Sequence, residues 1–195
     1  MFLNKTLVYF ILGITTFFTS KDAVFETSSV IIKERSTLLI NGESNINNFS
    51  CLYDNDEIKK TIPISYTVEG DIIRFDKTVL LLNNNFFDCG GNGINRDFRK
   101  TLNTDNYPQI ALTLNEIERT ADPSNINAEI AIKIAGISHD YRIPVEIIKN
   151  KNLIVNGQLK IKLTDFNLNT PKKLFGIIAV DENIEITFNL EIEKQ

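Results

Sequence analysis

Hydrophobic and polar residues alternate one by one along much of this chain. The alternation is clearest in residues 126–135, 153–163 and 184–192, where an apolar residue occupies almost every second position. Successive side chains on a β-strand point to opposite faces, so each stretch would have one apolar and one polar face. This is typical of an antiparallel sheet with one buried side. A doubly wound parallel sheet would instead show continuous apolar strands separated by helices.

Turn signals separate the alternating stretches. Glycine, asparagine, aspartate or proline lies in residues 68–71, 120–125, 135–138 and 149–153. We count about eight or nine strands at roughly even spacing, and those between residues 126 and 163 are long. Long sequential strands favour an up-and-down barrel over a sandwich of short strands. We therefore predict an all-β fold, an extended antiparallel up-and-down β-barrel of about eight strands.

One segment, residues 92–102 (NGINRDFRKTL), has a helical period instead. Its apolar residues recur every four positions, at Ile94, Phe98 and Leu102. This spacing predicts one short helix, capped by Asn92 or Asn95. A helix of this length is marginal alone, so we expect it to dock its apolar stripe, for instance across one end of the barrel.

The first 20 residues have the composition of a secretory signal peptide. Lys5 is followed by a largely apolar run over residues 7–18 and then by small polar residues. The run is short for a membrane span, and the alternative interpretation is an uncleaved N-terminal anchor. We predict a signal peptide at 1–20 and a single domain at 21–195, in the periplasm or secreted, with no stable membrane span after cleavage.

The charge of the chain limits its partners. The formal net charge is −4 and becomes −5 without Lys5, because the leader contains no acidic residue. A mildly acidic chain without a basic cluster argues against nucleic acid and anionic lipid surfaces.

The two cysteines, Cys51 and Cys89, suggest a disulfide in an exported chain. The closed loop would span about 39 residues, for which a chain-entropy model gives roughly 4 kcal/mol of stabilisation. Two free buried thiols are the alternative.

Residues 86–108 contain the most suggestive loop but match no chemical motif. Read as a calcium loop from Asp88, they place Arg99 where a bidentate glutamate belongs. Three glycines between positions 90 and 93 resemble a phosphate-binding turn, but no Gly-Lys-Ser/Thr follows. We therefore predict no metal site and no cofactor here.

Catalysis also lacks candidates. The single histidine, His139, neighbours Asp140 on an expected strand, so the two side chains point to opposite faces. A local hydrogen bond is the simpler role for His139; a polar contact to a ligand headgroup is the alternative. Because the two cysteines are expected to pair and there is one histidine, the chain lacks the free thiol of a thiol protease and the set of ligands of a zinc hydrolase. We predict no catalytic residues and a protein that is not an enzyme.

Several strings together resemble the YceI-like family, in the two-cysteine form associated with Bacteroidota. They are residues 42–51 (GESNINNFSC), 88–114, 155–168 and 174–190. The resemblance covers nearly the whole chain after the leader, from about Ser28 to Ile192. It implies a lipocalin-like barrel, export to the bacterial periplasm, and a long isoprenoid chain of the polyprenyl or quinone type held inside. It also implies that residues 86–108 form a helical element and linker.

An apolar pocket needs inward-facing aliphatic and aromatic side chains. The alternating faces predict such a barrel lining, namely Ile130, Ile132, Ile143, Val145, Leu159, Ile161, Ile186 and Phe188. The expected function is non-enzymatic binding of an isoprenoid-like or other long-chain amphiphilic lipid or quinone. The alternative is an exported structural or interaction module with a filled interior. The expected partners are an apolar small molecule and, further, a second copy of the chain in a homodimer.

Overall fold

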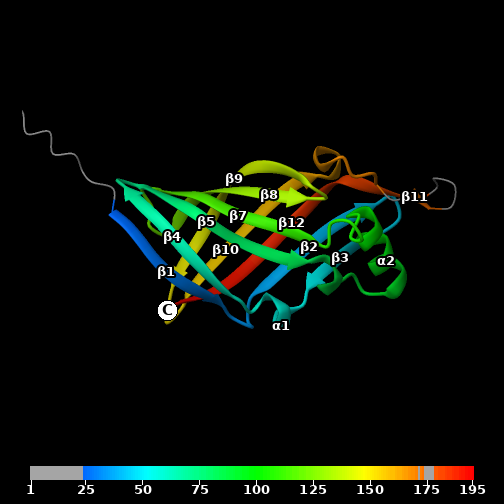
Figure 1. Ribbon diagram of the computed structural model, residues 1–195. Coiled ribbons are helices and arrows are strands. Elements are labelled where there is room, and N and C mark those ends of the chain that lie inside the picture. Colours follow the sequence, from blue (N-terminus) through cyan, green and yellow to red (C-terminus); the bar gives the residue numbers. More distant parts are fainter. Residues whose placement is uncertain (1–23, 171, 174–177) are drawn as a thin grey trace, which may run out of the picture.

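The computed structural model describes residues 24–170, 172–173 and 178–195, and they form one long antiparallel barrel (Figure 1). Eight strands form a ring that the pairing of its first and last members closes. In ring order they are β1 (Val24–Ile32), β4 (Thr61–Glu69), β5 (Ile72–Asn83), β7 (Gln109–Arg119), β8 (Asn125–Ile134), β9 (Ile137–Lys149), β10 (Leu153–Lys162) and β12 (Ile178–Lys194). The predicted fold class is confirmed. The predicted signal peptide, residues 1–20, lies outside the described residues.

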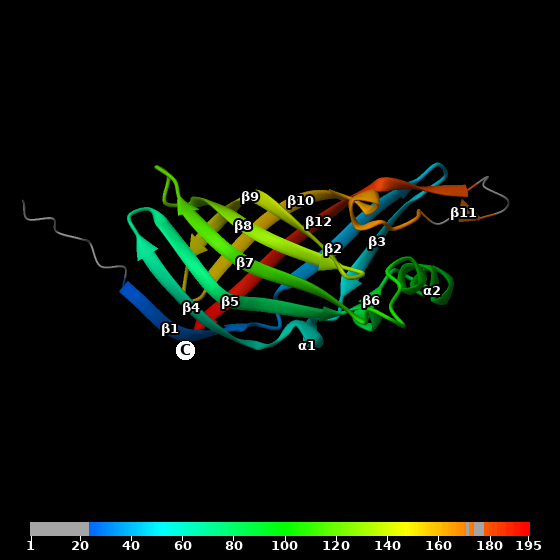
Figure 2. The same ribbon diagram turned by 45° about the horizontal axis from the view of Figure 1, so that its top comes forward.

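The last strand, β12, holds two other strands along one edge. Its C-terminal end pairs with β1, with Ile192 opposite Ile32. Its earlier part pairs with β2 (Thr37–Ser44), where Asn189 lies opposite Thr37. Strands β1 and β2 are therefore two halves of one bent strand that runs beside β12 (Figure 2).

The bend between these halves, residues 33–36, is fixed to β12 by hydrogen bonds. The backbone N–H of Lys33 donates to the carbonyl of Glu191 (2.9 Å). The N–H of Glu191 donates to the hydroxyl of Ser36 (2.9 Å), which is fully buried. Because both bonds reach the same residue of β12, the strand can change direction without leaving the sheet.

Beyond the ring, β2 continues the sheet into β3 (Asn48–Tyr53) and β6 (Phe87–Asp88). Strand β3 leads through the one-turn helix α1 (Asn55–Ile58) into β4, and β5 leads through the 3-10 turn η2 (Asn84–Phe86) into β6. Ile58 of α1 is almost completely buried and packs in the core at this junction. Strand β10 is followed by the 3-10 turn η3 (Leu163–Phe166) and then by the short strand β11 (Lys172–Lys173), which pairs with β12.

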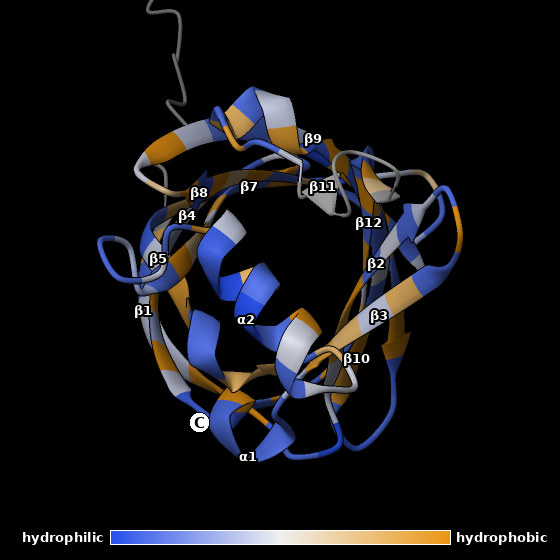
Figure 3. Cartoon of the chain, turned by 90° about the vertical axis from the view of Figure 1, so that its right-hand side faces the viewer, coloured by the Kyte–Doolittle hydropathy of each residue, from blue (hydrophilic) through white to orange (hydrophobic). Residues whose placement is uncertain are grey.

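The predicted helix is present as α2 (Asn92–Thr101), and Figure 3 shows it across one end of the barrel. The predicted cap is wrong: Gly91 occupies the N-cap position, and no side chain caps the helix. The side chain of Asn95 instead hydrogen-bonds to residues that precede the helix. Its Oδ1 accepts from the N–H of Cys89 (2.6 Å), and its Nδ2 donates to Asp88 (2.9 Å).

The turn expected at 135–138 is a two-residue hairpin between β8 and β9, with Ile134 opposite Ile137. Ala135 (φ 48°) and Gly136 (φ 86°) both adopt left-handed backbone. Two such residues match the twist of the flanking strands, which explains the tight link. No helix in the described part of the chain is long and apolar enough to cross a membrane.

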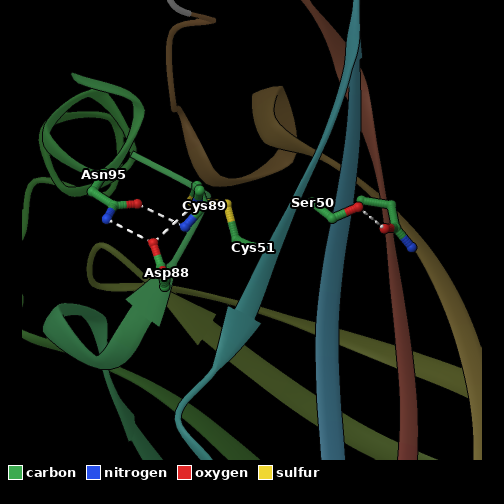
Figure 4. The surroundings of a disulfide bond; sticks show 7 residues. Ser50, Cys51, Asp88, Cys89 and Asn95 are labelled. Atoms are coloured by element: carbon green, nitrogen blue, oxygen red, sulfur yellow. Dashed lines mark hydrogen bonds between the residues drawn. A yellow bond between two sulfur atoms is a disulfide. The ribbon is translucent and has the colours of Figure 1, made fainter. Parts of the chain in front are cut away.

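The predicted disulfide between Cys51 and Cys89 is present (Figure 4). It joins β3 to the residue that follows β6, with the two Cα atoms 3.9 Å apart. Both cysteines are buried in the main core. The bond therefore anchors the base of α2 to the barrel wall.

Replacing both cysteines (Cys51→Ala together with Cys89→Ala) should lower the free energy of unfolding by about 2–5 kcal/mol, because the unfolded chain regains the freedom of a long loop. Urea denaturation at neutral pH measures the change. A reducing agent should destabilise the natural protein similarly and leave the double variant unaffected; an unchanged urea midpoint would contradict the stabilising role.

Candidate functional site

A cavity of about 460 Å³ lies inside the barrel at the end where α2 packs. Strands β2, β5, β7, β8, β10 and β12 supply its walls, and α2 closes one side. Its apolar wall includes Leu38, Ile40, Leu82, Ile110, Leu112, Ile132, Ile134, Ile161, Ile184 and Ile186. Small-molecule sites typically enclose roughly 300–1,000 Å³ between mostly apolar walls, so the cavity can hold an organic ligand.

Polar side chains on the cavity lining gather in two places. Ser44 ends β2, Asn48 begins β3 and Asn47 lies in the turn between them, while Asp97 and Thr101 come from α2. Asp97 is the one ionisable side chain among the described residues that line the cavity. An unpaired charge is costly to bury, so this interior suits an uncharged apolar group.

The predicted barrel lining is divided among three places inside the barrel. Ile132, Ile161 and Ile186 line the cavity. Ile143 and Val145 belong to a second buried cluster with Ala128, which fills another part of the interior. Ile130, Leu159 and Phe188 pack against both the main core and this second cluster, and with Tyr141 they form what we term the cavity floor. Contact between these side chains and a ligand stays a prediction.

Phe188 of the floor lies over a glycine on the next strand. Gly157 of β10 is its direct cross-strand partner, and a Cβ built on Gly157 would lie 2.2 Å from the ring. Gly42 and Phe49 repeat the arrangement at the cavity wall. The glycines leave the space that the aromatic rings occupy, so these two positions set the shape of the interior.

Several cavity residues were not in the predicted set. Ile110 and Leu112 alternate with polar or small residues in β7, and this signal could have identified them. Leu38 and Ile40 were hidden because Leu39 interrupts the alternation in β2. Ile94 and Phe98 of α2 were assigned to a docking stripe, and the structure places both on the cavity.

Helix α2 is held at both ends, because the disulfide lies just before it and Leu102, directly after it, is buried in the main core. The ring of Phe98 packs against Phe87 of β6 (centroids 5.1 Å apart). No residue of α2 is fully buried. Gly90, Gly91 and Gly93 have open space around them, although Gly90 needs its positive φ of 85°. The helix therefore covers the cavity with residues that are only partly buried.

The segment that leads from β6 into α2 contains a perturbed carboxyl group. Asp88 accepts hydrogen bonds from the side chain of Asn95 (2.9 Å) and the N–H of Gly90 (3.0 Å). Both bonds favour the charged carboxylate and hold the pKa of Asp88 below its usual value of 3.8. The bond from Asn95 is the larger cause, and the bond from Gly90 the smaller.

His139 has a structural environment. Its Nε2 donates to the backbone carbonyl of Asp165 (2.7 Å), and its ring meets the edge of Phe166 (5.2 Å). Among the residues that the structure describes, no group of histidine, cysteine or acidic side chains could hold a metal ion. His139 thus makes a local hydrogen bond, which is the first of the two roles predicted for it.

Comparison with known proteins supplies independent information. A model of the YceI-like domain family matches residues 55–192. Burkholderia cenocepacia BcnA has a similar structure, with a TM-score of 0.61 and 16% identity over 83% of this chain and 99% of that chain. A polyisoprenoid binding domain from Saccharophagus degradans, implicated in plant cell wall breakdown, also has a similar structure. Its TM-score is 0.56 and its sequence identity is 13%, over 87% of this chain and 100% of that chain. At these identities the structural likeness shows a shared fold. A search of the curated proteins gives no match.

Asn95→Ala should raise the pKa of Asp88 towards 3.8, because the carboxylate loses its side-chain donor. A lowered folded pKa contributes stability above the unfolded pKa, and this contribution is lost as pH falls through the folded pKa. The variant should therefore lose part of this acid-sensitive stability, and the Cys89 amide should exchange faster. NMR titration and hydrogen exchange measure both. Asn106→Ala, after α2, is the control that should change neither; an unshifted Asp88 in Asn95→Ala would contradict the assignment.

Gly157→Ala should destabilise the protein by roughly 1–3 kcal/mol, because the new methyl group overlaps the ring of Phe188. Thermal and urea unfolding measure the loss. Gly93→Ala is the matched control, since it adds the same methyl group in open space and should stabilise α2 slightly. Equal effects of the two substitutions would show that Phe188 does not require the glycine.

Proposed function

Because this chain belongs to the YceI-like domain family, as its motifs predicted, we propose that it is a non-enzymatic binding protein for a long-chain isoprenoid-like lipid. The ligand class includes polyprenyl lipids and quinones, and its chain would occupy the cavity beneath α2. The bound lipid is cargo, and the protein would shield it from water.

The observation that carries this proposal is the apolar cavity of about 460 Å³ with a single ionisable side chain on its described lining. Transfer of a hydrocarbon chain from water into such a space gains about 0.8 kcal/mol per buried CH₂ group. Several buried isoprene units therefore supply useful affinity without a catalytic or metal site.

The comparisons support the same ligand class. The Saccharophagus degradans structure is described as a polyisoprenoid binding domain. The present chain shares the fold of that domain over 87% of the present chain's length. The enzyme alternative has less support, since His139 is engaged with a backbone carbonyl.

A location in the periplasm or outside the cell fits two features. The disulfide between Cys51 and Cys89 requires an oxidising environment to persist. The predicted signal peptide at residues 1–20 would deliver the chain there. These features support the location, and fractionation of the producing cells would test it directly.

A filled structural module is the second candidate, and the cluster of Ala128, Ile143 and Val145 favours it. That cluster packs part of the barrel solidly, as expected of a scaffold without a ligand. The homodimer also stays a prediction. Binding experiments on the cavity separate the two functions, because only the carrier depends on the space remaining open.

Ile186→Trp should weaken lipid binding while leaving the barrel folded, because the larger side chain projects into the cavity from β12 and reduces its volume. The natural chain contains no tryptophan, so the new side chain is also a unique fluorescence probe. The measurement is native mass spectrometry of protein isolated from its own host, followed by extraction and identification of the lipid.

Leu81→Trp is the matched control, because Leu81 is 42% exposed and is absent from the cavity lining. It should retain the lipid found in the natural protein. An apo mass for the natural protein, with no shift on addition of polyprenyl or quinone ligands, would refute the carrier function and favour the filled module.

A further inference from the structure

The cavity lining changes from apolar to polar towards the solvent. Among the described residues, every buried side chain on the lining is a hydrocarbon or, at Cys89, part of the disulfide. The polar side chains on the lining are all at least partly exposed. We term them the polar rim, which consists of Ser44, Asn47, Asn48, Asp97 and Thr101.

This change of polarity favours one orientation of an amphiphilic ligand. A headgroup buried among hydrocarbon side chains loses its hydrogen bonds to water and gains none in return. At the polar rim the same headgroup stays close to water and to side-chain partners, while its chain is buried deeper in the cavity. The lining therefore suits a lipid that enters tail first.

Helix α2, which crosses this end of the barrel (Figure 3), supplies part of the rim. The four α2 residues on the lining, Ile94, Asp97, Phe98 and Thr101, have the spacing i, i+3, i+4 and i+7 of one helix face. Asp97 and Thr101 are four residues apart, so their Cβ atoms lie about 5–6 Å from each other in a regular helix. One headgroup can therefore contact both side chains.

The cationic side chains of α2 lie on its other faces. Arg96 and Lys100 are exposed, and neither is on the cavity lining. Arg99 borders a separate hollow together with Asp88 and Asn95. Within the described part of the lining, a ligand at the rim thus meets one carboxylate and no lysine or arginine.

These groups favour a hydroxyl headgroup over an anionic one. A carboxylate has about four positions at which it accepts hydrogen bonds, so Asp97 can accept from a ligand hydroxyl alongside its other partners. The hydroxyl of Thr101 can both donate and accept. A phosphate carries charge of the same sign as Asp97 and finds no cation on the described lining, so it would be repelled at this position.

We propose that Asp97 and Thr101 select the headgroup of the bound lipid. An uncharged hydroxyl group, as in a prenyl alcohol or a quinol, donates a hydrogen bond to the Asp97 carboxylate and forms a second bond with Thr101. The hydrocarbon chain extends from the rim into the barrel, and a prenyl phosphate is disfavoured. This assignment rests on the proposed lipid-binding function and adds the orientation and the headgroup class.

The test compares three probes that share one carbon skeleton: geranylgeraniol, geranylgeranyl phosphate and the hydrocarbon that lacks the oxygen. Native mass spectrometry of delipidated protein gives the three dissociation constants, and the natural protein should bind the alcohol most tightly. Thr101→Val should weaken alcohol binding by roughly threefold to tenfold, the range expected for one hydrogen bond. Asp97→Asn should weaken it similarly and should tighten phosphate binding by roughly fivefold, since the like charge is removed.

Three comparisons separate these effects from damage to the fold and from net charge. Unchanged hydrocarbon binding in both variants shows that the cavity is intact. Thr101→Ser keeps the hydroxyl and should retain the preference for the alcohol. Asp105→Asn is the matched control, because Asp105 is exposed after α2 and is not on the cavity lining. It removes the same charge and should change none of the three affinities.

The outcomes distinguish the two proposals. Equal binding of alcohol and hydrocarbon, tightest binding of the phosphate, unchanged alcohol affinity in both Asp97→Asn and Thr101→Val, or equal effects of Asp97→Asn and Asp105→Asn would overturn the headgroup assignment and leave the carrier function intact. Binding of none of the three probes by the natural protein would overturn the carrier function itself.

Discussion

The barrel depends on the hydrogen-bonded edge of β12, where one long strand holds two shorter ones. The C-terminal end of β12 closes the eight-strand ring through β1, and its earlier part carries β2 and the sheet that continues from it. The bend at residues 33–36 stays attached through Ser36 and Glu191, so the edge has no unpaired gap at the change of direction. Because β2 supplies Leu38 and Ile40 to the cavity wall, closure of the fold and formation of the cavity depend on the same strand, β12, through two different pairings.

The interior combines an open and a filled part, and the two have different tasks. The cluster around Ala128, Ile143 and Val145 has the close packing that stabilises a small barrel. The volume beneath α2 forgoes such packing, and the disulfide at the base of the helix offsets some of the resulting loss. A barrel filled throughout would be more stable and would leave no space for the proposed ligand, so the floor separates the close-packed part of the interior from the open part.

Most of the fold could be predicted because period-two alternation reports directly on which face of a strand is buried. It predicted β8, β10 and β12, and Ile132, Ile161 and Ile186 from the predicted lining face the cavity. The alternation could not show which lining residues form the floor and which form the cavity wall. That depends on contacts between strands, such as that of Phe188 with Gly157. Local sequence also misassigned Asn95 as a helix cap. An asparagine near a helix start can accept from backbone on either side, and here the partner is Cys89, before the helix.

The floor limits the length of chain that the cavity could enclose. In the proposed carrier function, each CH₂ group of the lipid that is buried in the cavity would contribute about 0.8 kcal/mol until the space is full. Atoms beyond that length would lie outside the cavity, whose lining includes Ile46, a residue that is 61% exposed. For the proposed lipid, affinity would therefore rise with chain length and reach a plateau once the cavity is full.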